Sequence, residues 1–469
     1  MQKRRVRWAA WLVPGTAALA LGLLAPPPSG AQAPVPAGGE FQVNTYTTAR
    51  QLAPSVAADA GGDFVVVWYS DGSPGTDTSG QSIQGQRYTS GGSAQGAEFQ
   101  VNTYTTDSQF RPSVAADADG DFVVVWESYG SSGTDTALVS IQGQRYASNG
   151  STQGAQFQVN TYTTSFQLYS SVTADADGDF VVVWQSDQAS GTDTSFRSIQ
   201  GQRYASNGAS QGAQFQVNTY TTSNQSRPVV AAAADGDFVV VWHSIGSSGT
   251  DTSYGSIQGQ RYASDGSAQG TEFQINTYTT SGQGYPFVVA DADGDFTVVW
   301  DSIGSSGTDT SLTSMQGQRY ASGGSTQGAQ FQVNTYTTGI QRLPSVAAAA
   351  DGDFVVAWDS SGSATDTSVR SIQGQRYSSD GSTQGGQFQV NTYTTDTQVF
   401  PRVAAASDGD FVVAWQSYGS SGSDTHLGSI QGQRYRLPIA VPAMSPAKKF
   451  ALAAALLLLG AGYALRRRS

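Results

Sequence analysis

Three turns of the sequence place alternating carboxylates beside a glycine. The pattern Asp-Ala-Asp-Gly-Asp supplies Asp117, Asp119 and Asp121, then Asp175, Asp177 and Asp179, then Asp291, Asp293 and Asp295. Carboxylate oxygens in a glycine-containing loop suit hard cations such as Ca²⁺. The corresponding turns elsewhere lack one of these carboxylates, and no later glutamate completes an EF-hand-like loop. Two interpretations therefore stay open: Ca²⁺ sites, or hairpin turns with solvated aspartates. No other cofactor is expected.

Groups suited to acid–base or nucleophilic catalysis are scarce. The 469-residue chain has no cysteine and only two histidines, His243 and His426, which fall in different repeats. No serine-elbow motif is present. The Gly-Thr-Asp-Thr-Ser loops do not match the Asp box, S-x-D-x-G-x-x-W, of sialidases. A nucleophile, a base and an orienting group are hard to assemble from this set, so we expect no enzymatic activity.

The sequence is built from repeats of about 58 residues. The motif Phe-Gln-Val-Asn-Thr-Tyr-Thr-Thr, with Ile for Val once, starts at Phe41, Phe99, Phe157, Phe215, Phe273, Phe331 and Phe388. Each repeat also carries an apolar segment ending in tryptophan, at Trp68, Trp126, Trp184, Trp242, Trp300, Trp358 and Trp415. Internal repeats of this length indicate an array of one supersecondary unit.

Each repeat contains four candidate β-strands, here called a, b, c and d. In the second repeat these are residues 112–118, 121–128, 140–148 and 155–161. Strand b is apolar on both faces, as expected of a strand covered on both sides. The Asp119–Gly120 pair predicts a two-residue hairpin turn between a and b, because such turns need positive φ angles.

These features predict an all-β, seven-bladed β-propeller. An open solenoid would need atypical capping repeats, and 58 residues are few for separate immunoglobulin-like sandwiches. The repeats begin with a strand d at 41–47 and end with a strand c at 429–435. We therefore expect the N-terminal strand to complete the last blade, which leaves no exposed sheet edge in the ring.

The repeats differ mainly on one side of the predicted ring. Variation falls in the d–a segments and around the b–c loops, including Tyr69, Glu127, Gln185, His243, Asp301, Asp359 and Gln416. Aromatic and arginine side chains are enriched at binding hot spots, and arginine holds carboxylates bidentately. The candidate binding residues in the d–a segments are Phe110, Arg111, Tyr169, Arg227, Tyr285, Arg342, Phe400 and Arg402. The alternative is a structural spacer whose solvated loops drift freely.

One arginine is the same in every repeat. The motif Gln-Gly-Gln-Arg-Tyr supplies Arg87, Arg145, Arg203, Arg261, Arg319, Arg376 and Arg434. We expect structural pairing with a nearby aspartate or carbonyl group rather than seven ligand sites.

The two ends differ in composition from the repeats. Residues 1–33 have a basic start, an apolar run and small residues, the pattern of a secretory signal peptide. Residues 448–469 place an apolar run between lysines and arginines and predict a transmembrane helix with a cytoplasmic arginine-rich end. The remaining expected boundaries are 34–39 for a linker, 40–436 for the propeller and 437–447 for a linker or sorting motif. Export to the cell envelope follows, with an extracellular glycan, polymer or protein as partner.

The charge of the repeat region argues against nucleic-acid binding. The chain has 24 lysine and arginine residues, of which four lie in the signal and five in the tail, leaving 15. All 36 acidic residues lie between the two ends, so this region has a net charge of −21. Such a surface repels phosphate backbones and anionic lipid headgroups.

The combination DGDFVVVW, IQGQRY and FQVN resembles a repeat of large secreted bacterial proteins, over residues 41–435. The resemblance implies an extracellular binding or structural role. The tail resembles the IPTL-CTERM and PEP-CTERM sorting signals, with VPAMSP at 441–446 before the apolar run. It lacks the Trp-Gly of the usual motif. The resemblance implies processing by an exosortase-type enzyme, and a plain membrane anchor is the alternative.

Overall fold

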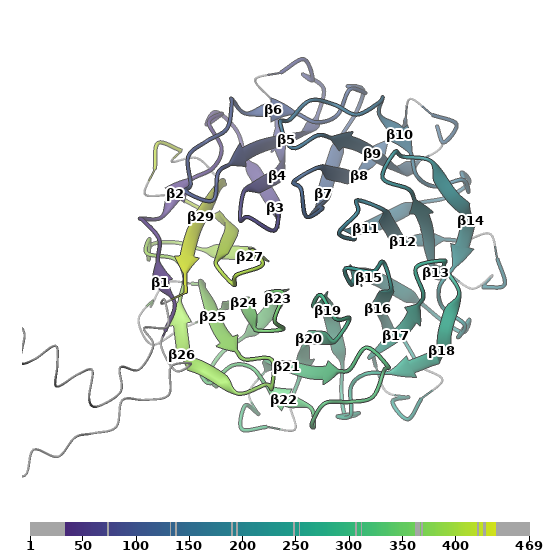
Figure 1. Ribbon diagram of the computed structural model, residues 1–469, viewed down its shortest axis with the longest axis vertical. Helices are drawn as coiled ribbons and strands as arrows, with labels where there is room; N and C mark the ends of the chain where they lie inside the picture. Colours follow the sequence, from purple (N-terminus) through teal and green to yellow (C-terminus); the bar gives the residue numbers. More distant parts are fainter. Residues whose placement is uncertain are drawn as a thin grey trace, which may run out of the picture. The chain divides into compact units, whose positions relative to one another are not determined.

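The computed structural model describes residues 33–437, with short gaps in the loops. The gaps are 73–74, 132, 137, 189–190, 194–195, 247–248, 253, 305–306, 311, 362–365, 367–368, 420–421 and 425–427. Seven antiparallel sheets stand around a common axis, as Figure 1 shows, which confirms the predicted seven-bladed propeller. The predicted signal peptide (apart from residue 33) and the predicted membrane helix lie outside the described residues. Within the described residues, no helix is long and apolar enough to cross a membrane.

The blades are numbered in chain order. Blades 1 and 2 comprise β3 (Gln51–Ala58), β4 (Phe64–Asp71), β5 (Gln81–Tyr88) and β6 (Phe99–Gln100), then β7 (Gln109–Ala116), β8 (Phe122–Tyr129), β9 (Val139–Tyr146) and β10 (Phe157–Gln158). Blades 3 and 4 comprise β11 (Gln167–Ala174), β12 (Phe180–Asp187), β13 (Arg197–Tyr204) and β14 (Ser210–Gln216), then β15 (Gln225–Ala232), β16 (Phe238–Ser244), β17 (Ser256–Tyr262) and β18 (Ala268–Gln274). Blades 5 and 6 comprise β19 (Gln283–Ala290), β20 (Phe296–Ile303), β21 (Thr313–Tyr320) and β22 (Phe331–Gln332), then β23 (Gln341–Ala348), β24 (Phe354–Ser360), β25 (Ser371–Tyr377) and β26 (Thr383–Gln389). Blade 7 comprises β27 (Gln398–Ala405), β28 (Phe411–Ser417) and β29 (Ser429–Arg436), together with β1 (Val35–Pro36) and β2 (Phe41–Gln42).

The repeated tryptophan fills the space between neighbouring blades. Trp126 is fully buried and packs with Val65 and Val67 of blade 1 and with Val124 of its own strand. Its indole N–H donates a 3.2 Å hydrogen bond to Oε1 of Gln109 at the start of strand a. The same bond joins every repeated tryptophan to the glutamine 17 residues earlier. Each blade interface therefore buries a large aromatic group without leaving its polar atom unpaired.

The glycine of Gln-Gly-Gln-Arg-Tyr makes room for the phenylalanine of the outer strand. A Cβ atom on Gly143 would lie 2.6 Å from the Phe157 ring, and the corresponding glycines of the other repeats face the same contact. Phe157 also packs at 5.5 Å against Tyr204 of the next blade. These two repeated motifs are therefore linked by packing, since the glycine admits a ring that holds two blades together.

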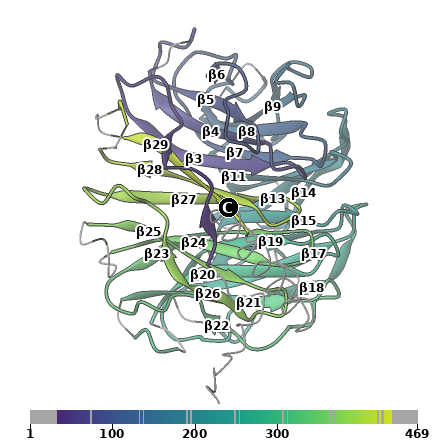
Figure 2. The same ribbon diagram turned by 60° about the vertical axis from the view of Figure 1, so that its left-hand side comes forward.

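The last blade closes the ring with strands from both ends of the repeat region, as predicted. Phe41 of β2 pairs with Gly432 of β29, and Val35 of β1 pairs with Arg436. Figure 2 turns this seam toward the reader. The amide of Asn44 also donates to Asp424 and accepts from the backbone of Ile430, both at 2.8 Å. Residues 34–39, which we expected to be a linker, thus include strand β1.

Three details of the predicted blade are wrong. Strand a of blade 2 begins at Gln109 rather than 112, and the outer strand β10 contains only Phe157–Gln158. The a–b connection is a longer turn, with a 2.9 Å hydrogen bond from Asp117 N–H to Asp121 C=O, and of its residues only Gly120 has positive φ, at 87°. The Asp-Gly pair predicts a two-residue turn because both residue types tolerate positive φ, but Asp119 does not adopt it here.

The two faces of the ring differ in what they carry. One face, here called the turn face, carries the a–b and c–d turns, and the other, the loop face, carries the b–c loops and d–a connections. Strand β29 starts at the loop face and ends at Arg436 on the turn face, where Val35 pairs with it. The described chain therefore enters and leaves the ring on the turn face, opposite the variable loops.

Candidate functional site

A β-bulge interrupts strand a of every blade at its loop-face end. The bulge residue is never glycine, yet each has a φ between 46° and 54°. These residues, here called the inner rim, are Ala53, Arg111, Tyr169, Arg227, Tyr285, Leu343 and Phe400. Left-handed backbone costs a residue with a Cβ atom about 1–3 kcal/mol, and such strain concentrates at functional sites. Strands a stand nearest the ring axis (Figure 1), so the inner rim brings seven variable residues together.

Four inner-rim residues form one continuous stack across blades 2 to 5. The Arg111 guanidinium carbon lies 4.6 Å from the centre of the Tyr169 ring. Arg227 lies between two rings, at 4.5 Å from Tyr169 and 4.3 Å from Tyr285. Cations over aromatic faces at these distances attract the ring quadrupole. Cationic and aromatic side chains therefore alternate along the stack. Tyr285, at one end of it, is 37% exposed.

A buried carboxyl group binds two residues of the stack and holds them in position. Glu127 is fully buried in β8, and its Oε1 accepts a 2.7 Å hydrogen bond from the backbone N–H of Tyr169 in the next blade. Its Oε2 lies 3.2 Å from Nη1 of Arg111. In the same way, Oε1 of Gln416 in blade 7 accepts a 3.2 Å hydrogen bond from the backbone N–H of Ala53 in blade 1. The variable residue of strand b therefore positions the inner rim of the following blade.

Three of these strand b positions hold carboxyl groups that burial keeps protonated to unusually high pH. Desolvation raises the pKa of Glu127 to about 7, against the opposing effects of Arg111 and the Tyr169 N–H. Desolvation likewise raises the pKa of Asp301 and of Asp359 to about 7. Asp359 is bound by Arg342 at 3.2 Å. At the same position in blade 4, burial and the nearby Arg227 lower the pKa of His243 to about 4.

These shifts predict that stability depends on pH. Because the pKa of Glu127 is higher in the folded chain than its ordinary value of 4.5, its stabilising contribution is present below pH 4.5 and is lost as pH rises to about 7. Asp301 and Asp359 act in the same direction from pH 3.8 upward, whereas His243, with its lowered pKa, opposes them between about 4 and 6.5. Each unit of pKa difference corresponds to about 1.4 kcal/mol.

Glu127→Gln isolates one of these groups, because glutamine occupies the same position at Gln185 and Gln416. The variant is expected to lose less thermal stability than the wild type between pH 5 and pH 8. Melting curves at both pH values test this. Parallel pH profiles for the two proteins would show that Glu127 does not titrate in this range.

One arginine lies deeper inside the ring. Arg402 of blade 7 places its guanidinium carbon 4.7 Å from the ring centre of Phe287, which belongs to blade 5. The guanidinium therefore extends past blade 6. Its Nη1 donates a 2.8 Å hydrogen bond to the carbonyl of Pro401, and desolvation lowers its pKa to about 10. Phe287 and Tyr285 are two residues apart on β19. Arg402 contacts the first ring and Arg227 the second, so both arginines lie along the same strand.

The aspartates that suggested calcium lie on the turn face and bind backbone groups. Oδ1 of Asp117 accepts from the N–H groups of Asp119 and Asp121 at 3.0 and 2.9 Å. Asp121 accepts from the Ser148 N–H and from Gln153 in the c–d turn. The corresponding residues of the other two turns, Asp175, Asp177 and Asp179, then Asp291, Asp293 and Asp295, bond in the same way. No group of three metal-ligating side chains is found in the part of the chain that the structure describes, so the calcium interpretation gains no support.

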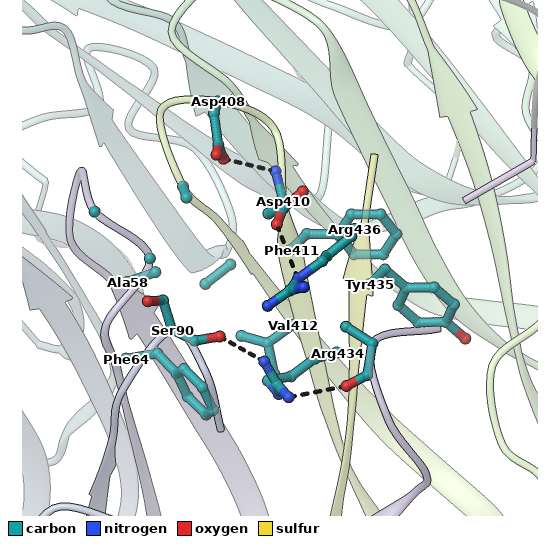
Figure 3. Close-up of a pocket in the computed structure, with 15 residues that line it drawn as sticks. Ala58, Phe64, Ser90, Asp408, Asp410, Phe411, Val412, Arg434, Tyr435 and Arg436 are labelled. Atoms are coloured by element: carbon teal, nitrogen blue, oxygen red, sulfur yellow. Dashed lines mark hydrogen bonds and ion pairs between the residues drawn. The ribbon is translucent and has the colours of Figure 1, made fainter. Parts of the chain in front are cut away.

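A polar cavity of about 230 Å³ lies at the seam between blades 7 and 1 on the turn face. Figure 3 shows Arg434 donating to the carbonyl of Ser90, and Arg436 beside Asp410. Arg434 also donates to the carbonyl of Ala37. The repeated arginine makes the same kind of contact elsewhere: Arg87 donates to the carbonyl of Asn149 in the next blade at 2.6 Å. The expected structural pairing of this arginine is confirmed there, and the polar groups of the seam serve ring closure.

The structure separates the predicted binding residues into three groups. Arg111, Tyr169, Arg227 and Tyr285 form the stack, and Phe400 continues the inner rim in blade 7. Phe110 and Arg342 precede the bulges, where they pair with Glu127 and Asp359 of their own blades. Arg402 lies inside the ring. All eight belong to strand a rather than to loops, because the strands start earlier than predicted.

Sequence reasoning missed a second set of residues on the loop face. The same b–c loop position carries an exposed apolar side chain in five described repeats, at Leu138, Phe196, Tyr254, Leu312 and Val369. Phe196 is 77% and Tyr254 is 85% exposed. Their recurrence once per repeat was a readable signal. The buried carboxyl groups of Glu127, Asp301 and Asp359 were seen as variable positions, but their burial depends on packing between blades.

Comparison with known proteins gives a likeness of fold. No family model and no curated protein matches the sequence. A structure of unknown function from Dyadobacter fermentans is 10% identical, covers 85% of this chain and 98% of its own, and gives a TM-score of 0.48. An α-L-arabinanase of Penicillium chrysogenum is 13% identical, with 84% and 98% covered and a TM-score of 0.43. The NanB sialidase of Streptococcus pneumoniae is 10% identical, with 85% and 70% covered and a TM-score of 0.47.

These comparisons correct the expectation that the protein is not an enzyme. Arabinanases, arabinofuranosidases and sialidases are among the structures of the same fold, so the sequence-based exclusion of catalysis does not stand. The exclusion relied on the scarcity of histidine and cysteine. Glycoside hydrolysis usually needs only two carboxyl groups, so a scarcity of histidine and cysteine does not exclude it. At these identities the likeness shows the fold alone.

Proposed function

We propose that this protein is exported and binds an extracellular ligand on its loop face, at the inner rim. The observation that carries the proposal is the stack of Arg111, Tyr169, Arg227 and Tyr285. The fold does not require arginine or tyrosine at this partly exposed, strained rim, since alanine (Ala53) occupies the same bulge in blade 1. Arginine and tyrosine are the residue types that dominate binding hot spots.

Val35 and Arg436 pair on the turn face, so both ends of the described chain lie opposite the variable loop face. The proposal includes the signal peptide and either a retained membrane anchor or removal of the tail by an exosortase-type enzyme. Glycans, other polymers and proteins are the partner classes under this proposal.

A binding screen with matched variants tests the proposal against the structural-spacer interpretation. Full-length protein in mild detergent is applied to a glycan array and to intact cells. The inner-rim variant carries Arg111→Ser, Tyr285→Ser and Phe400→Ser. The control carries Asp119→Ser, Asp177→Ser and Asp293→Ser, three exposed positions on the turn face.

Loss of binding is expected for the inner-rim variant alone, by at least tenfold. Equal binding by both variants and the wild type, at equal melting temperatures, would remove the inner rim from the function. Absence of any ligand for the wild type would favour the spacer.

A further inference from the structure

Arg227 differs from Arg111, the other arginine of the inner rim, in forming no salt bridge within the described residues. Arg111 is paired with Glu127 at 3.2 Å. Arg342, one residue before the bulge of blade 6, is paired with Asp359, also at 3.2 Å. Within the described residues, Arg227 makes no ion pair. Its one hydrogen bond there goes to the hydroxyl of Tyr169 at 3.4 Å.

The two tyrosines determine from which side a ligand can approach Arg227. Its guanidinium carbon lies 4.5 Å from the ring centre of Tyr169 and 4.3 Å from that of Tyr285, so the two rings flank the group. A ligand therefore approaches its N–H groups between the two rings. Edge-on binding through two parallel N–H groups matches the planar carboxylate, which accepts both bonds in that plane. The rings also hold the guanidinium in place before a ligand arrives, which lowers the entropic cost of binding.

A second cation without a salt bridge, Arg402, lies deeper inside the ring than Arg227. Arg402 contacts Phe287, two residues beyond Tyr285 on β19, and it makes no ion pair within the described residues. The region between the two chain ends carries a net charge of −21, yet neither guanidinium group forms a salt bridge within the described residues. The charge of Arg227 does act on the buried Glu127 and Asp301, where it opposes the rise of their pKa values. At the turn-face end of the ring axis lies a hollow of about 210 Å³ whose lining includes Asp59, Asp117, Asp175 and Asp291. These carboxylates repel an anion from the turn face.

Exposed aromatic rings lie outward from the stack in the same sector. Arg197 forms a parallel bridge with Asn224, which places Phe196 beside the start of β15, the strand of Arg227. Gly255 bridges Gly282 in the same way and places Tyr254 beside the start of β19. Both rings are more than three quarters exposed, at 77% and 85%. Flat apolar surfaces of this kind suit the faces of sugar rings in a chain that extends from the inner rim.

From these observations we infer that the ligand is an acidic polysaccharide, held by the carboxylate of one sugar at the edge of Arg227 and extending across Phe196 and Tyr254. This inference rests on the proposed function and names the class of ligand for the same site. The fork of Arg227 supplies recognition of the carboxylate, Arg402 adds attraction from within the ring, and the exposed rings supply contact area for neighbouring sugars.

Calorimetric titration of the full-length protein with oligogalacturonate tests the inference. The matched ligands are the same oligomer after reduction of its carboxyl groups, a neutral galactan of equal length, and a sulfated dextran. Binding is expected for the carboxylated oligomer, with at least tenfold weaker binding after carboxyl reduction. Arg227→Lys keeps the charge but loses the planar fork, so it is expected to weaken binding at least tenfold. Asp119→Ser on the turn face serves as the control variant and should bind like the wild type.

The outcomes separate this inference from the proposed function. Binding of the neutral galactan that is lost in the Arg111, Tyr285 and Phe400 variant would keep the function and overturn the ligand class. Preference for sulfated dextran, or equal affinity of Arg227→Lys and wild type, would also overturn the carboxylate assignment. No heat with oligogalacturonate at millimolar concentration would overturn the inference.

Discussion

Replacing Trp184 by alanine is expected to lower the free energy of unfolding by about 3–5 kcal/mol, the usual cost of emptying the site of a large buried aromatic side chain. Trp184 is fully buried between blades 2 and 3, where it packs with Val125 and Ile141 of the preceding blade. Its removal also leaves Oε1 of Gln167 without its 2.9 Å partner. The cavity cannot collapse easily, because β-sheets on both sides hold it open.

Chemical denaturation of the wild type and variant measures this loss. Tyr254→Ala is the control, since the side chain is 85% exposed and its removal should change stability by less than about 0.5 kcal/mol. Gln167→Ala is expected to cost about 1–3 kcal/mol by leaving the indole N–H unpaired. Equal midpoints for Trp184→Ala and Tyr254→Ala would contradict the packing described between blades.

Deleting residues 40–48 is expected to destabilise the whole ring rather than one blade. The deletion removes β2, exposes the edge of β29 and takes away Val43, which is 1% exposed. It also removes Asn44, whose amide binds Asp424 and the backbone of Ile430. We expect a loss of more than about 3 kcal/mol, the cost of one emptied large site, because several buried groups are lost together. The freed edge should also promote association between molecules.

The control for this deletion removes residues 34–38 and leaves β2 in place. That variant loses the two-residue strand β1 and the carbonyls of Ala37 and Gly38, which accept hydrogen bonds from Arg434 and Gln433, but it should retain most of the stability. Thermal unfolding and light scattering compare the two. Similar melting of the 40–48 deletion and the intact chain would show that closure by the N-terminal strand contributes little.

The architecture could be predicted because each blade carries the same local signals. A strand that is apolar on both faces and carries a tryptophan must be covered by neighbouring sheets on both sides. The strands at 41–47 and 429–435 each lack a partner at their own end of the repeat region, so they were expected to pair with each other. Those arguments need only spacing and polarity. They also identified the arginine of each repeat as structural, and Arg87 indeed binds the carbonyl of Asn149.

The site could be predicted only in part. Composition pointed to Arg111, Tyr169, Arg227 and Tyr285, but not to their contact, since they lie 58 residues apart in the sequence and meet through the order of the blades. The bulges were not predicted, because no glycine marks the positive φ of these residues. Glu127 is polar in a strand whose burial comes from the next blade, so its burial and its hydrogen bond to Tyr169 follow from ring assembly.

The central claim is that the ligand binds on the loop face, at Arg227. A crystal structure of the full-length protein with bound oligogalacturonate tests this most directly. The account predicts a carboxylate of the oligomer in the plane of the Arg227 guanidinium, at hydrogen-bonding distance from two of its nitrogens, with Tyr169 and Tyr285 on either side. An oligomer bound on the turn face, or on the loop face without contact to Arg227, would contradict it.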